Sequence, residues 1–144
     1  MKMINTLIAV ALLGAASAPA LAHEHTNDVF NIRTDLQFAQ NRLAAIGCTQ
    51  QNDAMCAAVS SIRMAGVTLS AIPESAGDVE LYNDLTIAAD ILMPATNERA
   101  LKGQFEGLDA AQSEQASKIL TDVMHQSGNL LGLIADLESK KGKN

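Results

Sequence analysis

The sequence predicts an all-α protein: an antiparallel bundle of four main helices plus a short helix, fastened by one disulfide. Apolar residues recur at steps of three and four through long segments, which is the spacing of one face of an α-helix. No segment shows the alternation of apolar and polar residues that is typical of a strand. Because the connections between the periodic segments are short, consecutive helices are expected to run in opposite directions.

The chain begins with a segment that has the features of a secretory signal. Lys2 provides a positive charge, an apolar run follows it, and the run ends in "APALA", with small residues at Ala20 and Ala22. The apolar run is too short to span a bilayer comfortably. We therefore expect residues 1–22 to be a signal peptide that is cleaved after Ala22. Residues 23–144 then form a single domain with no stable membrane anchor.

The next two periodic segments predict a helical hairpin. The first helix is expected to begin at a cap provided by Asn27 or Asp28 and to end at Gly47. Its apolar stripe consists of Val29, Ile32, Leu36, Ala39, Leu43 and Ile46. The second helix is closed by Pro73, and its stripe consists of Met55, Val59, Ile62, Gly66 and Leu69.

A third helix is expected to open within residues 75–78 and to stop at Pro94, with a stripe of Leu81, Leu85, Ala88 and Leu92. A short fourth segment, starting at Thr96 or Asn97, carries Leu101, Phe105 and Leu108. The last helix is the longest, and Asp109 with Gln112 has the spacing of a capping box at its start. Its stripe runs through Ala116, Leu120, Val123, Ser127, Leu130, Ile134 and Leu137. Gly128 and Gly132 interrupt it, where they permit close packing or a bend.

The only two cysteines, Cys48 and Cys56, flank a turn between the end of the first helix and the helix start expected at Asn52–Asp53. That turn brings the thiols together, and in an oxidising compartment they are expected to form a disulfide. A redox dithiol usually shows the tighter C-x-x-C spacing, and two thiolate metal ligands would lack nearby partners. The pair therefore predicts a structural disulfide that pins the first hairpin.

Charge and composition argue against several classes of partner. The net charge is −6, so the surface repels nucleic-acid phosphates and anionic lipids. The chain has no tryptophan, one tyrosine and three phenylalanines, which is a poor supply of stacking surfaces for bases or sugars. The one basic cluster, at Lys140, Lys141 and Lys143, follows a helix end, where cations complement the backbone dipole.

The sequence contains no recognisable catalytic constellation. His125 is the only histidine outside the N-terminal region, and it lies on a polar helical row with Lys118, Asp122 and Asn129. Asp122 and His125 form one carboxylate-x-x-His pair, whereas di-iron bundles need two such pairs and two further acids. The haem-attachment sequence and the common hydrolase and phosphate-loop motifs do not occur. We therefore expect a protein that is not an enzyme; an enzyme using His125 would require that side chain to line a pocket.

Cleavage after Ala22 would make His23, Glu24 and His25 the first three residues of the mature chain. A free amine, two amide nitrogens and the imidazole of the third residue can together wrap a square-planar ion, an arrangement that suits Cu(II) or Ni(II). This spacing resembles the amino-terminal copper- and nickel-binding motif of otherwise unrelated proteins. The alternative interpretation is a frayed, polar N-terminus ahead of the first helix.

These observations support two functional hypotheses. The first is an exported protein, periplasmic or secreted, that acts without a cofactor as a non-enzymatic binding module for a protein or small ligand. The second is a periplasmic copper- or nickel-binding protein that uses His23, Glu24 and His25 at the mature N-terminus.

Overall fold

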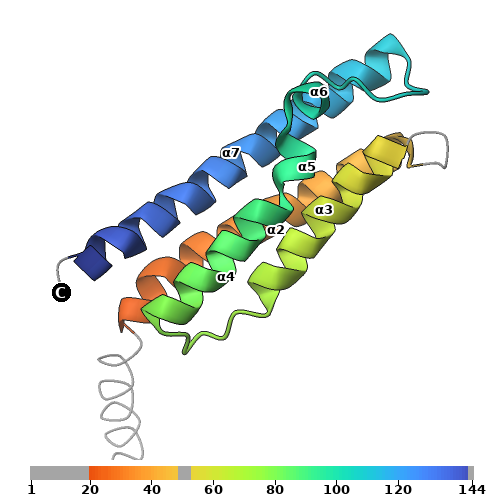
Figure 1. The fold of residues 1–144 in the computed structure, drawn as a ribbon. Coiled ribbons are helices and arrows are strands. Elements are labelled where there is room, and N and C mark those ends of the chain that lie inside the picture. The colour runs from red at the N-terminus through yellow and green to blue at the C-terminus, as the bar shows by residue number, and fades with distance from the viewer. Residues whose placement is uncertain (1–19, 49–52, 143–144) are drawn as a thin grey trace, which may run out of the picture.

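In the computed structural model the described part of the chain contains six helices (Figure 1). The structure describes residues 20–48 and 53–142, with the side chains of residues 25–48 and 53–140, and no strand occurs in these ranges. The helices are α2 (Ala20–Gly47), α3 (Asp53–Ser70), α4 (Asp78–Ile91), α5 (Met93–Thr96), α6 (Glu98–Leu101) and α7 (Ala110–Gly142). The all-α prediction is confirmed.

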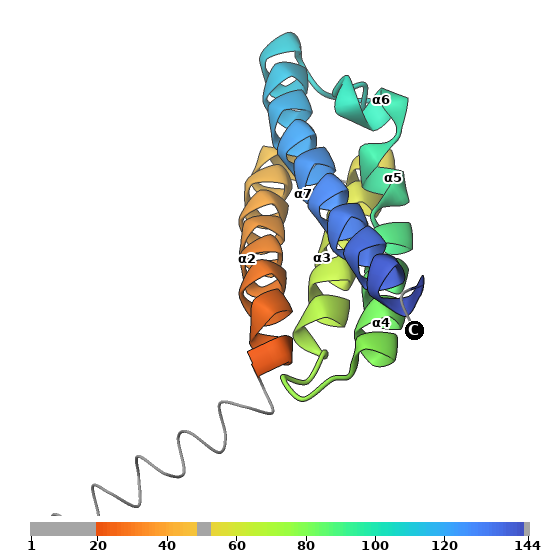
Figure 2. The same cartoon turned by 90° about the vertical axis from the view of Figure 1, so that its left-hand side faces the viewer.

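The four long helices share one apolar core. α2 packs against α3 and α7, and α4 packs against the same two helices. Figure 2 shows α7 crossing obliquely over the others, from the side of α2 to the side of α4. The stripe predicted for the first helix is confirmed, since it is buried from Val29 to Leu43. Ile119 on α7, which the predicted stripe omits, is also fully buried. Among the described residues, no helix combines the length and apolarity that crossing a bilayer requires.

The start of α2 differs from the prediction. The helix begins at Ala20, so Asn27 and Asp28 are exposed residues inside it and not caps. The reason is that the packed face extends one turn before Val29, to His25, which is only 3% exposed. The end of α2 at Gly47 is confirmed. Gly47 has φ of +128°, a conformation that residues with a Cβ rarely adopt.

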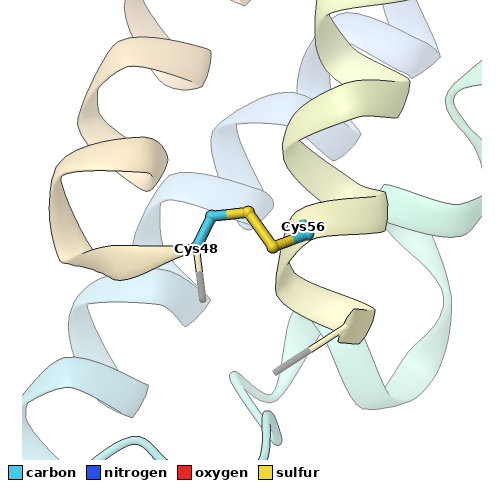
Figure 3. Close-up of a disulfide and its surroundings, with 2 residues drawn as sticks. All are labelled: Cys48 and Cys56. Atoms are coloured by element: carbon cyan, nitrogen blue, oxygen red, sulfur yellow. A yellow bond between two sulfur atoms is a disulfide. The ribbon is translucent and has the colours of Figure 1, made fainter. Parts of the chain in front are cut away.

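The predicted disulfide joins the end of α2 to the first turn of α3 (Figure 3). The Cα atoms of Cys48 and Cys56 are 4.9 Å apart, within the range that a disulfide requires. α3 begins at Asp53; Asn52, the other predicted start, lies outside the described residues. The link between two cysteines eight positions apart closes the α2–α3 hairpin at one end.

The region before α7 contains two four-residue helices, α5 and α6, where the sequence predicts one short helix. The Asn97 side chain caps α6 by accepting a hydrogen bond of 2.9 Å from the Ala100 amide. Phe105 and Leu108 follow α6 and lie outside any helix. Gly103 accounts for this, because its φ of +67° turns the chain and a Cβ there would collide with the Ser113 backbone carbonyl.

α7 begins at the predicted capping box. The Asp109 amide donates to Gln112 Oε1 at 3.0 Å, and the Gln112 amide donates to Asp109 Oδ1 at 2.8 Å. A Cβ placed on Gly128 or on Gly132 would meet no atom within 4 Å. The prediction that these glycines permit close packing is therefore wrong within the described part of the chain.

Candidate functional site

A cavity of about 270 Å³ lies beside the start of α2, between that helix, the end of α3 and the start of α4. We call it the His25 pocket. Its walls are formed by His25, Thr26, Val29, Phe30, Arg33, Leu69, Ile72, Pro73, Glu74, Ala76 and Leu81. Apolar side chains make up most of this set, and the polar groups come mainly from one helix. Such a combination is typical of small-molecule sites.

The connection between α3 and α4 closes one side of the His25 pocket. α3 stops after Ser70, and the Ala76 amide then donates to the Pro73 carbonyl at 3.0 Å in a turn. Pro73 fixes φ and supplies no amide donor, so the helix does not continue through it. The turn leaves Glu74 exposed at the rim of the cavity, whereas Leu69 below it is buried.

His25 is the most buried polar residue of the pocket wall, with 3% of its surface exposed. Its Nε2 atom lies 3.2 Å from the Nζ atom of Lys140 on α7. A lysine ammonium can only donate hydrogen bonds, so Nε2 must be the acceptor. The tautomer that fits this contact carries its proton on Nδ1.

The Nδ1 atom of His25 is buried, and no described residue is its hydrogen-bond partner. With the proton on Nδ1, the group without a partner is an N–H donor. A buried donor without an acceptor costs about 1–3 kcal/mol. The wall of the His25 pocket therefore includes a residue with one ring nitrogen that no described residue satisfies.

Phe30 and Arg33 stand at the mouth of the same pocket. The Arg33 guanidinium carbon lies 5.0 Å from the centre of the Phe30 ring, which is the distance of a cation–π contact. Phe30 is 52% exposed, although it is one of the larger apolar side chains of α2. The pair gives the pocket an aromatic edge and a positive charge.

A second cleft, of about 330 Å³, lies between α2 and α7. We call it the His125 cleft, and it is lined by Asp35, Phe38, Ala39, Arg42, Asp122, Val123, His125, Gln126 and Asn129. Arg42 stacks on Phe38 at 5.5 Å, and Gln126 Nε2 donates to Asp35 Oδ2 at 2.8 Å. His125, Asp122 and Asn129 are exposed, which confirms the polar row. His125 lines this cleft. The alternative hypothesis, an enzyme that uses His125, requires such a position.

The predicted metal residues are only partly described. The backbone of His23 and Glu24 belongs to α2, but their side chains lie outside the described set, as do residues 1–19 of the predicted signal peptide. His25 is helical and buried, so the prediction of a frayed end is wrong for this residue. Among the described residues, no three or more His, Cys, Asp and Glu side chains are grouped to hold a metal ion.

The sequence carried one signal for the His25 pocket. His25 precedes Val29 by four positions, which is one more step of the buried stripe. A stripe that starts at Val29 omits this step and leaves His25 in a polar segment. Lys140, which orients the ring, lies 115 positions away and on another helix, so no local pattern connects the two residues.

Comparison with protein-family models, with curated proteins and with solved structures returned no match for this chain.

Proposed function

We propose that the protein is an exported, non-enzymatic binding module that takes a small ligand with an apolar body into the His25 pocket. The observation that carries this proposal is a cavity with mostly apolar side chains in its wall, which also includes the buried His25, whose Nδ1 atom has no hydrogen-bond partner among the described residues. Buried polar groups are normally hydrogen-bonded, and one that is not is frequently part of a functional site.

We propose that the fold around this site is the predicted antiparallel bundle of four main helices with its short connecting helices. The contacts of α2 and α4 with both α3 and α7 support this arrangement. We assign no catalytic role to His125 or to the polar residues beside it. Loss of a chemical activity on substituting one polar side chain, with folding and ligand binding unchanged, would overturn the non-enzymatic assignment.

Export is the second part of the proposal. We place the cleavage after Ala22 and the mature chain in the periplasm or outside the cell, without a membrane anchor. The Cys48–Cys56 disulfide supports an oxidising compartment, because intracellular thiols are usually kept reduced. Intact-mass measurement of protein recovered from its native compartment tests this point. A mass that retains residues 1–22 would contradict it.

The volume of the His25 pocket sets the size of the ligand. One water occupies about 30 Å³ of liquid, so the cavity of about 270 Å³ accommodates a molecule of roughly nine or ten non-hydrogen atoms. 1-Octanol has this size and no charge, which makes it a suitable first probe. Nuclear magnetic resonance titration is expected to shift the amides of Leu69, Ile72 and Leu81, which line the cavity.

A pair of matched variants locates the binding. Ala76 lines the pocket, so Ala76→Phe is expected to fill it and abolish octanol binding. Ala45 is exposed elsewhere on α2, so Ala45→Phe adds the same ring without touching the pocket. Equal octanol binding by both variants would overturn the assignment of the ligand site.

One observation favours the second candidate, a periplasmic copper- or nickel-binding protein. After cleavage, metal binding by the third residue uses its Nδ1 atom, because this nitrogen closes a six-membered ring with its own amide. In His25 that atom has no described partner, and the metal ion would displace its proton. The test compares Cu(II) titration of correctly processed protein with that of a variant carrying one extra N-terminal residue. Equal binding by both would exclude the terminal site.

A further inference from the structure

We infer that the protein forms a two-fold dimer through the outer face of α3, so that the partner on this face is a second copy of the same chain. Arg63 of each copy then lies opposite the acids Glu80 and Asp84 on α4 of the other. The inference is independent of the proposed ligand site, because none of these three residues lines the His25 pocket.

The first observation is that α3 is apolar on its outer face as well as on its inner one. Of its 18 residues, only Asp53 and Arg63 carry a charge. Met64 and Val67 on the outer face are 54% and 63% exposed. A surface helix normally presents polar and charged side chains to water, and a helix that is apolar all round is normally buried. The outer face of α3 therefore has the composition of a contact surface.

The residues of this face form a continuous row, which we call the α3 row. Its members follow one another at steps of three and four and carry no charge: Ala57, Ser60, Met64, Val67 and Ala71. At 1.5 Å per residue the row is about 21 Å long. α3 lies between α2 and α4, on the far side of the bundle from α7 (Figure 2), and the described residues leave all of the row exposed except the half-buried Ser60.

The two edges of the α3 row carry opposite charges. Arg63 follows Cys56 by seven positions, so it lies on the side of α3 that the disulfide fastens to α2. The other edge adjoins α4, since the Ser61 hydroxyl donates a hydrogen bond to the Ile91 carbonyl. α4 has no basic residue and four acids, namely Asp78, Glu80, Asp84 and Asp90. The row thus has a cation on one side and a set of acids on the other.

These charges are not paired with one another in the described part of the chain. No described residue forms an ion pair with Arg63, Glu80 or Asp84. Glu80 and Asp84 line a shallow hollow at the start of α4, and the other charged residue of its lining, Asp78, is also an acid. A guanidinium from another molecule is the chemical complement of such a hollow.

A two-fold axis that runs along α3 brings the opposite edges together. A half-turn about this axis places the two apolar rows against each other and the Arg63 edge of each copy against the acidic edge of its partner. The same contact forms twice, and the dimer is closed. An axis that runs across α3 would place Arg63 against Arg63, which is a repulsive contact. The chain itself therefore carries the charge pattern that its outer α3 face requires of a partner.

Sedimentation velocity over a series of protein concentrations measures the association. The protein is expressed from the full-length sequence and studied with the N-terminus that processing leaves. We expect the average mass to rise towards twice that of the monomer, and to rise less at high salt because salt screens the charge contacts. Met64→Glu is expected to weaken dimerisation by about tenfold, since it places two like charges at the centre of the contact. Met124→Glu changes a similarly exposed methionine on α7 and is expected to leave the dimer unchanged.

Charge reversal tests the pairing of the edges. Arg63→Glu, and separately Glu80→Lys combined with Asp84→Lys, are each expected to weaken dimerisation by about tenfold. A mixture of these two proteins is expected to associate more tightly than either alone, because a mixed dimer has opposite charges at both contacts. Arg42→Glu, which reverses an exposed arginine of α2 in the His125 cleft, serves as the control. Its mixture with the lysine variant is expected to show no such gain.

The outcomes separate the parts of the inference. A wild-type protein that is a monomer at every concentration, or that is recovered from its compartment bound to a different chain, would overturn it. Equal dimerisation of Met64→Glu and Met124→Glu would show that another face is used. Absence of a gain in the mixture would contradict the two-fold arrangement along α3. Circular dichroism checks that each variant is folded, and should Met64→Glu not fold, the mixing experiment decides.

Discussion

The two halves of α2 carry the same surface pair in two different settings. Arg33 stacks on Phe30 at the rim of the His25 pocket, and Arg42 stacks on Phe38 at the rim of the His125 cleft. Each space also has a histidine in its wall. His25 is buried and its Nδ1 lacks a described partner, whereas His125 is exposed to water, which can satisfy its ring. The comparison shows that burial, more than residue type, distinguishes a candidate ligand site from a polar surface.

The largest expected effect compares a leucine of the closed core with one of the pocket wall. Leu43, in the second half of α2, is fully buried, so Leu43→Ala is expected to cost about 3–5 kcal/mol of unfolding free energy. Leu81 borders the His25 pocket and is 7% exposed, so Leu81→Ala is expected to cost about 2–3 kcal/mol. Urea denaturation measures both. Equal losses would show that the pocket wall is packed like the core.

The next effect concerns the disulfide, which lies at the end of α2 away from the His25 pocket. Replacing Cys48 and Cys56 together by alanine is expected to cost about 2–3 kcal/mol, the chain-entropy value for so short a loop. Octanol affinity is expected to be unchanged, because the pocket is formed by the other end of the hairpin. A parallel loss of affinity would show that the two halves of α2 are energetically coupled.

A smaller effect separates the two histidines in ligand-free protein. His25→Phe removes a buried donor without an acceptor, so the unfolding free energy is expected to stay unchanged or to rise by up to about 1 kcal/mol. His125→Phe alters an exposed position and is expected to stay within about 0.5 kcal/mol. Thermal and urea unfolding provide the measurement. A clear loss of stability in His25→Phe alone would mean that the contacts of the imidazole, including that of Nε2 with Lys140, outweigh the cost of the unpartnered Nδ1.

The smallest expected effect concerns a contact between α4 and α7. Near Lys140, Glu138 accepts a hydrogen bond of 2.8 Å from the Tyr82 hydroxyl on α4. This bond, and then the nearby negative charge, raise the pKa of Tyr82 above its ordinary value of 10.0. Because the folded-state pKa is raised, the contact adds stability below pH 10 and loses it as the pH rises through the Tyr82 pKa.

Tyr82 is the only tyrosine of a chain without tryptophan, so absorbance near 295 nm follows this one group. Glu138→Ala is expected to return its pKa towards 10.0. Glu80→Ala, which removes an exposed acid from the same helix as Tyr82, serves as the control and is expected to have little effect. An identical titration in wild type and Glu138→Ala would show that the contact is absent in solution.

Local patterns predicted the helices because the information that forms them is local. The stripe from Val29 to Leu43, the glycine end at Gly47 and the capping box of Asp109 with Gln112 depend on residues within one or two turns. The disulfide followed from the turn between two predicted helices. The error at the short segment arose because Gly103 is fixed by its approach to Ser113, a tertiary contact.

The candidate site was much less accessible from the sequence. His25 was singled out, but for metal chemistry at a chain terminus and not for burial in a pocket. Its environment combines a turn at Pro73, the side chain of Lys140 and the start of α4, three parts of the chain that no sequence period relates. Phe30 and Arg33 likewise read as surface residues of an amphipathic helix until the cavity beside them is known.

The contact between His25 and Lys140 also has a consequence for the order in which the molecule is completed. During synthesis the disulfide hairpin of α2 and α3 is available early, since its cysteines lie eight positions apart. The imidazole of His25 acquires its partner only after α7 has emerged, 115 positions later. A chain broken off before α7 therefore retains its covalent link and every residue of the pocket wall, but its His25 has no Lys140 to hold the ring.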